Sequence, residues 1–433
     1  MVPPLWQSIE RIFDDKTSAA QKRSELMRLY KMELYKLCHK KSFLAGLLAV
    51  LLTGLFIFQQ DLRLQRCVIN DVEYTGLAAV RMNRQITEEF KGVLTDDKVS
   101  RIVDKYGFPK GAPDNFNRQN GNFLNTFLME YASDGCINGQ KDYRLATKAL
   151  PLAETELGQY HDEAGMSYRL EYFTGWDLFQ STLGILMLGV SILILYIVSV
   201  VFSEEEQIGT KPLLFTTKEG PASDTLAKVA AAFSVSAGVW LAAALFALLL
   251  HITVYGTDGL GCIASLIMHQ GFLPVPLMMQ SIGVYLIQVL LASLLGILEL
   301  CAITICVSAH CRSCFHAVVN AGIFYALPFA GFMLLQGLMV TLTVLSSRYT
   351  LHPAFITLCR YFSFLVGCLV HSSPIYLLIN RNNLIEIATC IPTPGTGNGM
   401  CMISLYATLM TAILLLVFCS VNACRRYRRI CRV

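Results

Sequence analysis

The stretch LFQSTLGILMLGVSILILYIVSVVF, residues 178–202, has no charged side chain in 25 residues. As an α-helix it is about 37 Å long, which exceeds the roughly 30 Å hydrocarbon core of a bilayer. Trp176 stands just before it, where tryptophan commonly anchors a helix at the membrane surface. The whole chain agrees: of 433 residues, 54% are apolar and only 15% are charged, against about 25% in soluble domains. We therefore predict an all-α polytopic membrane protein.

Basic residues decide how many apolar stretches span the membrane. Lys36, Lys40 and Lys41 precede the first stretch, and five arginines lie within residues 425–432. Because basic residues near span ends stay on the cytoplasmic side, both termini are expected in the cytoplasm of a multi-pass protein of the cytoplasmic membrane. This requires an even number of spans. We predict six, at residues 43–58, 178–202, about 226–254, about 277–308, about 315–345 and 402–421.

A further apolar run, residues 361–379, is interrupted midway by His371, Ser372, Ser373 and Pro374. Counting it as a span would put the arginine-rich tail, residues 422–433, outside the cell. We therefore assign residues 346–401 to an extracytoplasmic re-entrant pair of helices, which a membrane protein tolerates where the broken backbone is buried in protein.

Residues 59–175 form a large insert between the first two spans, with 14 Lys and Arg and 17 Asp and Glu. It is expected to be extracytoplasmic, since long domains translocate largely regardless of charge. Glycines and prolines between 107 and 113 separate helical patterns at residues 99–106 and 123–131. The insert is long enough for a small folded domain.

Residues 1–42 are predicted to hold a cytoplasmic amphipathic connecting helix. Leu26, Tyr30, Leu34 and Leu37 share one stripe, and lysines and arginines lie opposite. Two placements stay open: the helix lies in the membrane interface, or it is a solvated lead-in that packs on nothing.

Motifs for nucleotide binding and hydrolysis are missing. Gly209-Thr210-Lys211 lacks the rest of a phosphate-binding loop, so no cofactor is expected on this chain and no ATPase site of its own. An intramembrane enzyme would need paired catalytic residues, and none stand in the spans. The short basic clusters are explained by topology, so nucleic acid is not an expected partner.

The 15 cysteines lie mostly in or beside apolar runs, where cysteine packs as a small hydrophobe. Cys311 and Cys314, flanked by two histidines, lack the separated ligand pairs of structural zinc sites, so no metal site is predicted. Two pairs in the extracytoplasmic parts are open candidates for disulfides: Cys67 with Cys136, and Cys390 with Cys401.

Four polar residues stand inside predicted spans: Gln288, Glu299, Asn320 and Gln336. Glu299 is the only acidic residue in the core of a predicted span. Because such groups cost free energy in lipid, they face the bundle interior or a pathway. A translocation path and interhelical hydrogen bonds are both open explanations.

The segment after the second span, residues 203–228, reads SEEEQIGTKPLLFTTKEGPASDTLAK. An acidic helical turn leaves the membrane, and Gly209 is expected to end it. Ser223 or Asp224 is expected to cap the next helix. A short element held between two spans on the cytoplasmic face predicts a docking surface.

This segment resembles the type-2 exporter class of ABC transporter permeases, whose members tend to read Phe-x-x-Glu-x-x-x-Gly-Thr-x-x-x-Leu-Leu-x-Thr-Thr-x-x-Gly-Arg and then Lys at this place. The matching positions are Phe202, Glu205, Gly209, Thr210, Leu213 or Leu214, Thr216, Thr217, Gly220 and Lys228. Pro221 stands where the Arg is common. Residues 33–37 are also similar to the connecting helix of that class. The resemblance covers the whole membrane frame, in which residues 176–345 hold spans two to five, but not the insert.

The resemblance implies the permease subunit of an ABC exporter, which works with a second permease copy and with separate ATPase subunits that bind the ATP. It implies an ATPase-coupling surface made of Glu204, Glu205, Glu206, Gly209, Thr210 and Lys228. A hypothesis from another class also stays open: a membrane receptor whose extracytoplasmic domain binds a peptide or envelope ligand. The sequence does not indicate the transported substrate.

Overall fold

The computed structural model of the chain describes residues 23–108, 121–135, 146–155, 168–210, 220–267, 280–348, 373–379 and 405–429. Within these residues, six helices are long and apolar enough to cross a membrane. They comprise residues Lys41–Leu64, Thr174–Ile208, Ala222–Tyr255, Ile282–His310, Cys314–Gly331 and Met410–Tyr427. A mainly helical chain with six candidate spans is therefore confirmed.

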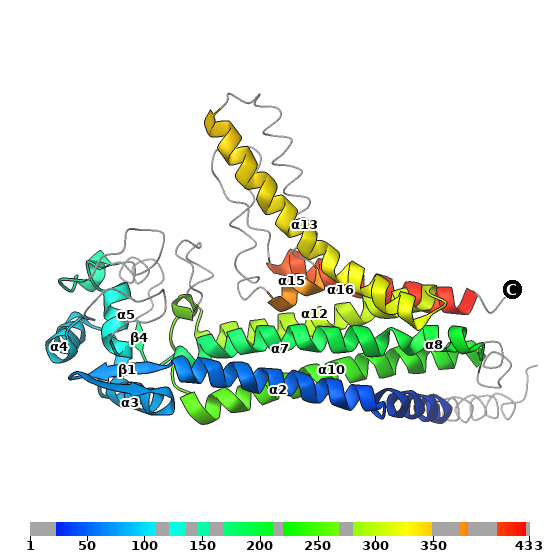
Figure 1. The fold of residues 1–433 in the computed structure, drawn as a ribbon, viewed down its shortest axis with the longest axis horizontal. Helices are drawn as coiled ribbons and strands as arrows, with labels where there is room; N and C mark the ends of the chain where they lie inside the picture. The colour runs from blue at the N-terminus through cyan, green and yellow to red at the C-terminus, as the bar shows by residue number, and fades with distance from the viewer. Residues whose placement is uncertain are drawn as a thin grey trace, which may run out of the picture.

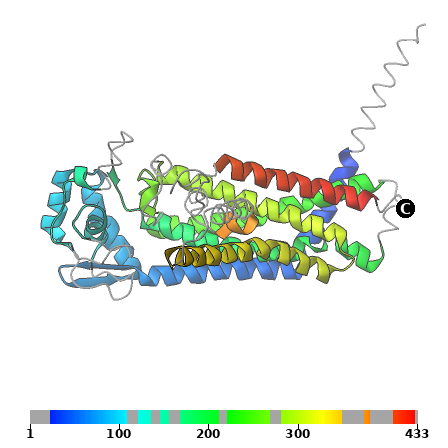
Figure 2. The same cartoon turned by 90° about the horizontal axis from the view of Figure 1, so that it is seen from above.

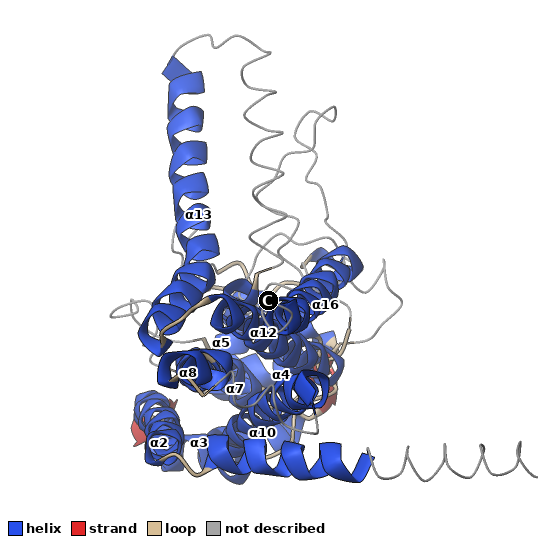
Figure 3. Cartoon of the chain, turned by 90° about the vertical axis from the view of Figure 1, so that its right-hand side faces the viewer, coloured by secondary structure: helices blue, strands red, loops and turns tan. Residues whose placement is uncertain are grey.

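The long helices are α2 (Lys41–Leu64), α7 (Thr174–Val198), α8 (Val200–Ile208), α10 (Gly220–Tyr255), α12 (Ile282–His310), α13 (Cys314–Arg348) and α16 (Leu405–Arg429). All of them except α13 lie side by side along one axis (Figure 1). α16 runs along α12, whereas α13 leaves the bundle along its length, as Figures 1 and 3 show. The first span is longer than predicted from residues 43–58, because the helix continues past its apolar part to Leu64.

The insert forms a small domain at one end of the bundle (Figure 2). Its strands make two antiparallel pairs, β1 (Arg66–Ile69) with β2 (Val72–Thr75), and β3 (Gly92–Val93) with β4 (Arg169–Leu170). Its helices are α3 (Gly76–Phe90), α4 (Asp96–Tyr106), α5 (Phe123–Tyr131) and the 3₁₀ turn η1 (Leu152–Glu154). The helical patterns at 99–106 and 123–131 are confirmed by α4 and α5.

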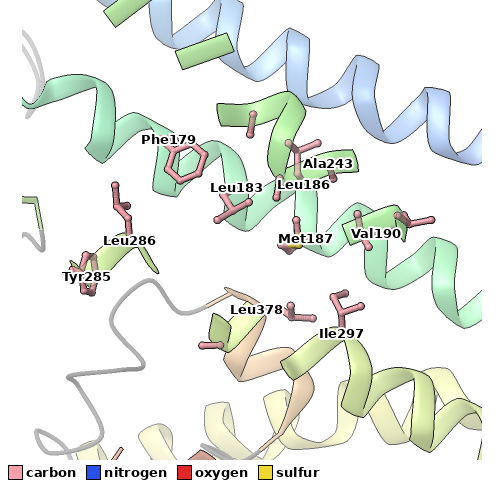
Figure 4. Close-up of a cluster of buried hydrophobic side chains, with 14 of the residues drawn as sticks. Phe179, Leu183, Leu186, Met187, Val190, Ala243, Tyr285, Leu286, Ile297 and Leu378 are labelled. Carbon is pink, nitrogen blue, oxygen red and sulfur yellow. The ribbon is translucent and has the colours of Figure 1, made fainter. Parts of the chain in front are cut away.

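The core of the bundle is centred on α7 (Figure 4). Leu183, Leu186, Met187 and Val190 of α7 are all buried, and Ile297 of α12 lies against them. These large aliphatic side chains hold the helices together by dispersion contacts. In a lipid environment such packing, rather than the exclusion of water, drives helices to associate.

The short helix α15 (Pro374–Ile379) packs against α12 and α7. It approaches closely at Gly296, where an added Cβ would lie 3.0 Å from Cβ of Leu377. α15 begins at the proline that interrupts the apolar run 361–379, as expected of proline in a first helical turn. Most of the predicted re-entrant region, residues 349–372 and 380–401, lies outside the described residues.

Candidate functional site

α8 continues α7 after a break at Ser199, which is held by a side chain from α12. The backbone N–H groups of Phe202 and Ser203 donate to Oγ of Ser308 at 3.1 and 3.2 Å. The Ser308 hydroxyl donates in turn to the carbonyl oxygen of Ser199 at 2.6 Å. One buried serine therefore satisfies the backbone at the junction and fixes α8 to α12.

Gly209 ends α8, as predicted. It adopts the left-handed conformation, with φ 75° and ψ 16°, which glycine accepts without steric cost. The N–H of Thr210 donates to the carbonyl oxygen of Glu205 at 3.1 Å and closes the helix end. Residues 211–219, the middle of the predicted docking segment, lie outside the described residues.

The amphipathic lead-in is helical over residues 23–38 and packs on the bundle. Tyr30 and Leu34 contact the core, Leu37 is buried, and the Tyr30 hydroxyl donates to Oγ of Ser234 on α10 at 2.9 Å. The alternative that this helix packs on nothing is therefore wrong, because its apolar side chains pack against the buried core of the bundle.

Lys228 lies at the centre of a buried group of charges, and its side chain is 0% exposed. Its Nζ atom lies 2.9 Å from Oε1 of Glu205 on α8 and 3.8 Å from Oε1 of Glu33 on the lead-in helix. It also donates to Asp224, one turn earlier on α10. The Tyr427 hydroxyl of α16 donates to Oε2 of Glu205 at 2.5 Å. We call these five residues the Lys228 cluster.

The Lys228 cluster brings one ammonium group to three carboxyl groups. Burial raises the pKa of Glu33, and the positive charges of Lys228 and Lys36 oppose this rise. The protonated form of Glu33 is therefore more favoured in the folded protein than it would be in water. Because a charge buried without its partner is strongly destabilising, the four elements that supply the cluster are tied to one another.

A second, more exposed ion-pair group stands beside the cluster. Nζ of Lys40 lies 3.1 Å and Nζ of Lys36 lies 3.6 Å from Oε2 of Glu204. The sequence indicated only a topological role for these two lysines. In the structure they also join the end of the lead-in segment to α8.

The six predicted coupling residues thus fall into two sets. Glu205 and Lys228 are buried and bind each other, and Glu204 pairs with lysines of the lead-in. Glu206 and Thr210 are half-buried, and Gly209 is exposed at the end of α8. The exposed side chain nearest this end is Ile208, which is 67% exposed.

The predicted helix cap at Ser223 or Asp224 is wrong. α10 begins at Gly220, so both residues lie inside the helix, where Asp224 accepts from Lys228 instead. Pro221 lies in the first turn, which tolerates proline because the N–H there has no helical partner.

The polar residues predicted inside the spans have different surroundings. Glu299 is fully buried in α12, and neither carboxyl oxygen has a hydrogen-bond partner among the described residues. Gln288 is half-buried and accepts a hydrogen bond from Nε2 of Gln280 at 2.9 Å. Asn320 is exposed on α13 and donates to Sγ of Cys311 at 3.6 Å. The side chain of Gln336 lies outside the described residues. No hydrogen bond joins any two of the other three side chains.

The insert domain is fastened to the loop after α10 through Asp258. Its carboxylate lies 2.8 Å from Nζ of Lys91 and 3.2 Å from Nη2 of Arg84. Its carbonyl oxygen accepts from Nε1 of Trp176 at 2.7 Å. The hydrogen bond from Lys91, followed by that from Arg84, holds the pKa of Asp258 below its usual value despite partial burial.

The cysteines give no sign of a site in the part of the chain that the structure covers. No group of three or more His, Cys, Asp or Glu among the described residues is placed to hold a metal ion. Cys67 is a free, buried thiol, and burial raises its pKa to about 12. Cys136, Cys390 and Cys401 lie outside the described residues.

Sequence reasoning missed four residues of this site: Glu33, Asp224 as a partner of Lys228, Ser308 and Tyr427. A lysine one turn after an acid, at the start of an apolar helix, signals the Asp224 pair. No local pattern signals the other three, because their partners are distant in the sequence. No family model, curated protein or solved structure matches the chain.

Proposed function

We propose that the chain is the permease subunit of an ABC-type exporter in the cytoplasmic membrane, with both termini in the cytoplasm. One observation supports this most: the Lys228 cluster ties both flanks of residues 211–219 to the lead-in helix and to α16. Because both flanks of the segment are anchored in this way, a movement imposed on it by a bound ATPase would reach several spans at once. The resemblance of residues 202–228 to type-2 exporter permeases supports the same function.

In this proposal, a separate ATPase subunit docks on the coupling loop, residues 203–228. Glu205 and Lys228 are buried, so they act by positioning the segment, whereas Gln207, Ile208 and Gly209 are exposed and available for contact. Closure of two ATPase subunits moves α8, and Ser308 passes that movement to α12. A switch of this kind requires contacts that differ between its two states, and the ion pairs of the cluster are the contacts that can differ.

The transport path belongs to the same proposal. Glu299 is a polar group buried among the helices without a hydrogen-bond partner in the described chain, as expected where a path opens in only one state. Gln288 stands on the same helix, nearer the insert domain. A second permease copy would complete the exporter, with the re-entrant region before the last span on the outer side.

The experiment is affinity purification of the full-length chain from native membranes, followed by identification of bound subunits. We expect an ABC ATPase with the wild-type chain, its loss with Ile208→Asp and its retention with Ile208→Leu. If the ATPase were still bound to the Ile208→Asp variant, the docking surface could not include the exposed end of α8. Absence of any ATPase from the wild-type preparation would overturn the exporter proposal.

A receptor is the second candidate, and the junction at Asp258 favours it. The insert domain is fixed to the loop after α10 by two cationic side chains and to Trp176 of α7, so a ligand on the domain would act directly on two spans. A receptor needs no ATPase, so the same purification separates the two functions.

A further inference from the structure

A cleft of about 350 Å³ lies where the insert domain meets the bundle. Its walls come from the end of α2, from α5, from the residues that lead into α7 and from Leu266. Sites for small molecules commonly have this volume and lie where domains meet. The insert domain lies at the opposite end of the bundle from α8, the helix that carries Glu205 of the Lys228 cluster (Figure 1).

Aromatic rings form one continuous wall of the cleft. The Phe123 ring centroid lies 4.9 Å from that of Tyr172 and 5.1 Å from that of Phe173. Phe127 extends the wall to Tyr131, with ring centroids 5.1 Å apart. The wall therefore offers ring faces, which carry negative potential.

Among the described lining residues, the charged side chains are mainly acidic. Glu130 of α5 and Asp177 in the first turn of α7 both line it. Arg66 is the one cationic side chain among the described lining residues, and its Nη1 atom lies 3.0 Å from Oε1 of Glu73. Arg66 is therefore already paired with a carboxylate from the neighbouring strand.

We propose that this cleft binds a hydrophobic organic cation, a small molecule with a quaternary or protonated nitrogen and apolar groups around it. Ring faces and carboxylates attract positive charge together, while the aromatic surface covers the apolar groups. A neutral or anionic molecule of the same shape gains only the apolar contact with the aromatic surface.

The experiment uses the full-length chain in nanodiscs of zwitterionic lipid and two probes of nearly the same shape and opposite charge, tetraphenylphosphonium and tetraphenylborate. Empty nanodiscs correct for partition into lipid. We expect saturable binding of the cation only. Asp177→Asn, Glu130→Gln and Phe123→Leu should each weaken it about tenfold, the size of one desolvated cation contact.

The matched control is Asp97→Asn, which removes a carboxylate that is 81% exposed on α4 and does not line the cleft. It should bind like the wild type. Asp177 also stabilises the start of α7 by its charge, so Glu130→Gln decides the question if the Asp177 variant fails to fold. Saturable binding of the anion with equal affinity, or wild-type affinity in Glu130→Gln, would overturn the proposal.

This inference stands apart from the exporter proposal, because binding is measured on the chain alone and without ATP. A chain that captures an ATPase but binds neither probe refutes only the cleft. A chain that binds the cation but captures no ATPase refutes only the exporter.

Discussion

The Nζ atom of Lys228 lies 2.9 Å from Oε1 of Glu205, and the lysine side chain is wholly covered. This ion pair joins the start of α10 to α8, across the residues proposed to receive the ATPase. Because no solvent screens it, the pair depends on the other members of the Lys228 cluster for its stability.

Replacing the lysine tests that dependence. Lys228→Met leaves the carboxyl groups of the cluster without their ammonium partner, which should cost about 3–5 kcal/mol. We expect a lower thermal unfolding midpoint for the purified protein in detergent. Lys31→Met, on the exposed face of the lead-in helix, is the control and should change little. Equal midpoints for the two variants would show that the cluster does not hold the helices together.

The hydroxyl of Tyr427 gives a milder test. Tyr427→Phe leaves Oε2 of Glu205 without its donor, at an expected cost of about 1–3 kcal/mol in unfolding free energy. Tyr196→Phe, at a tyrosine that is 49% exposed, serves as the control. Combined with Glu205→Gln, the effects should be non-additive, since the two residues share one hydrogen bond. Strict additivity would argue against the contact.

Ser308 should control how firmly α8 is held. Ser308→Ala leaves two buried N–H groups, those of Phe202 and Ser203, without their acceptor, and each costs about 1–3 kcal/mol. We expect faster amide hydrogen exchange in α8, measured by mass spectrometry. Ser420→Ala, which removes a hydroxyl bonded only within its own helix, should leave that rate unchanged. Unchanged exchange in Ser308→Ala would show that α8 needs no support from α12.

The junction at Asp258 should depend on pH. Its folded-state pKa lies below the ordinary value of 3.8, chiefly through the hydrogen bond from Lys91, so its contribution to stability is present above that value. The contribution is lost as the pH falls through the lowered pKa. At neutral pH, Asp258→Asn should therefore speed amide exchange at Gly259 by about fivefold at most, as expected for partly exposed ion pairs.

In acid, the wild type and Asp258→Asn should converge, because protonation removes the same charge. Asp97→Asn is the control and should exchange like the wild type at both pH values. A constant difference between wild type and Asp258→Asn down to strongly acidic pH would contradict this assignment.

The helical frame was predictable because its signals are local. Twenty or so apolar residues need a span whatever their neighbours are, and Gly209 ends a helix by its own backbone freedom. The predicted cap at Ser223 or Asp224 was wrong because it rested on a general preference of short polar residues for caps. In the structure the helix already begins at Gly220, and Asp224 accepts from Lys228 inside it.

The Lys228 cluster was only partly predictable. Glu205 and Lys228 were expected to be functional through a resemblance in sequence, not through any pattern that shows them to be partners. Glu33 and Tyr427 come from helices at opposite ends of the chain. Their approach depends on how whole helices pack, and helix periodicity alone does not determine that packing.

Glu205 and its hydroxyl donor Tyr427 are separated by 222 residues. At the usual speed of translation, about 5–20 residues per second, the ribosome needs on the order of 10–40 seconds to reach the tyrosine after making the glutamate. Throughout that interval the Glu205 carboxylate lacks its hydroxyl donor, because α16 has not yet been made. Completion of the Lys228 cluster is thus a late event in biosynthesis, and a chain that stops before α16 lacks the hydroxyl donor of Glu205.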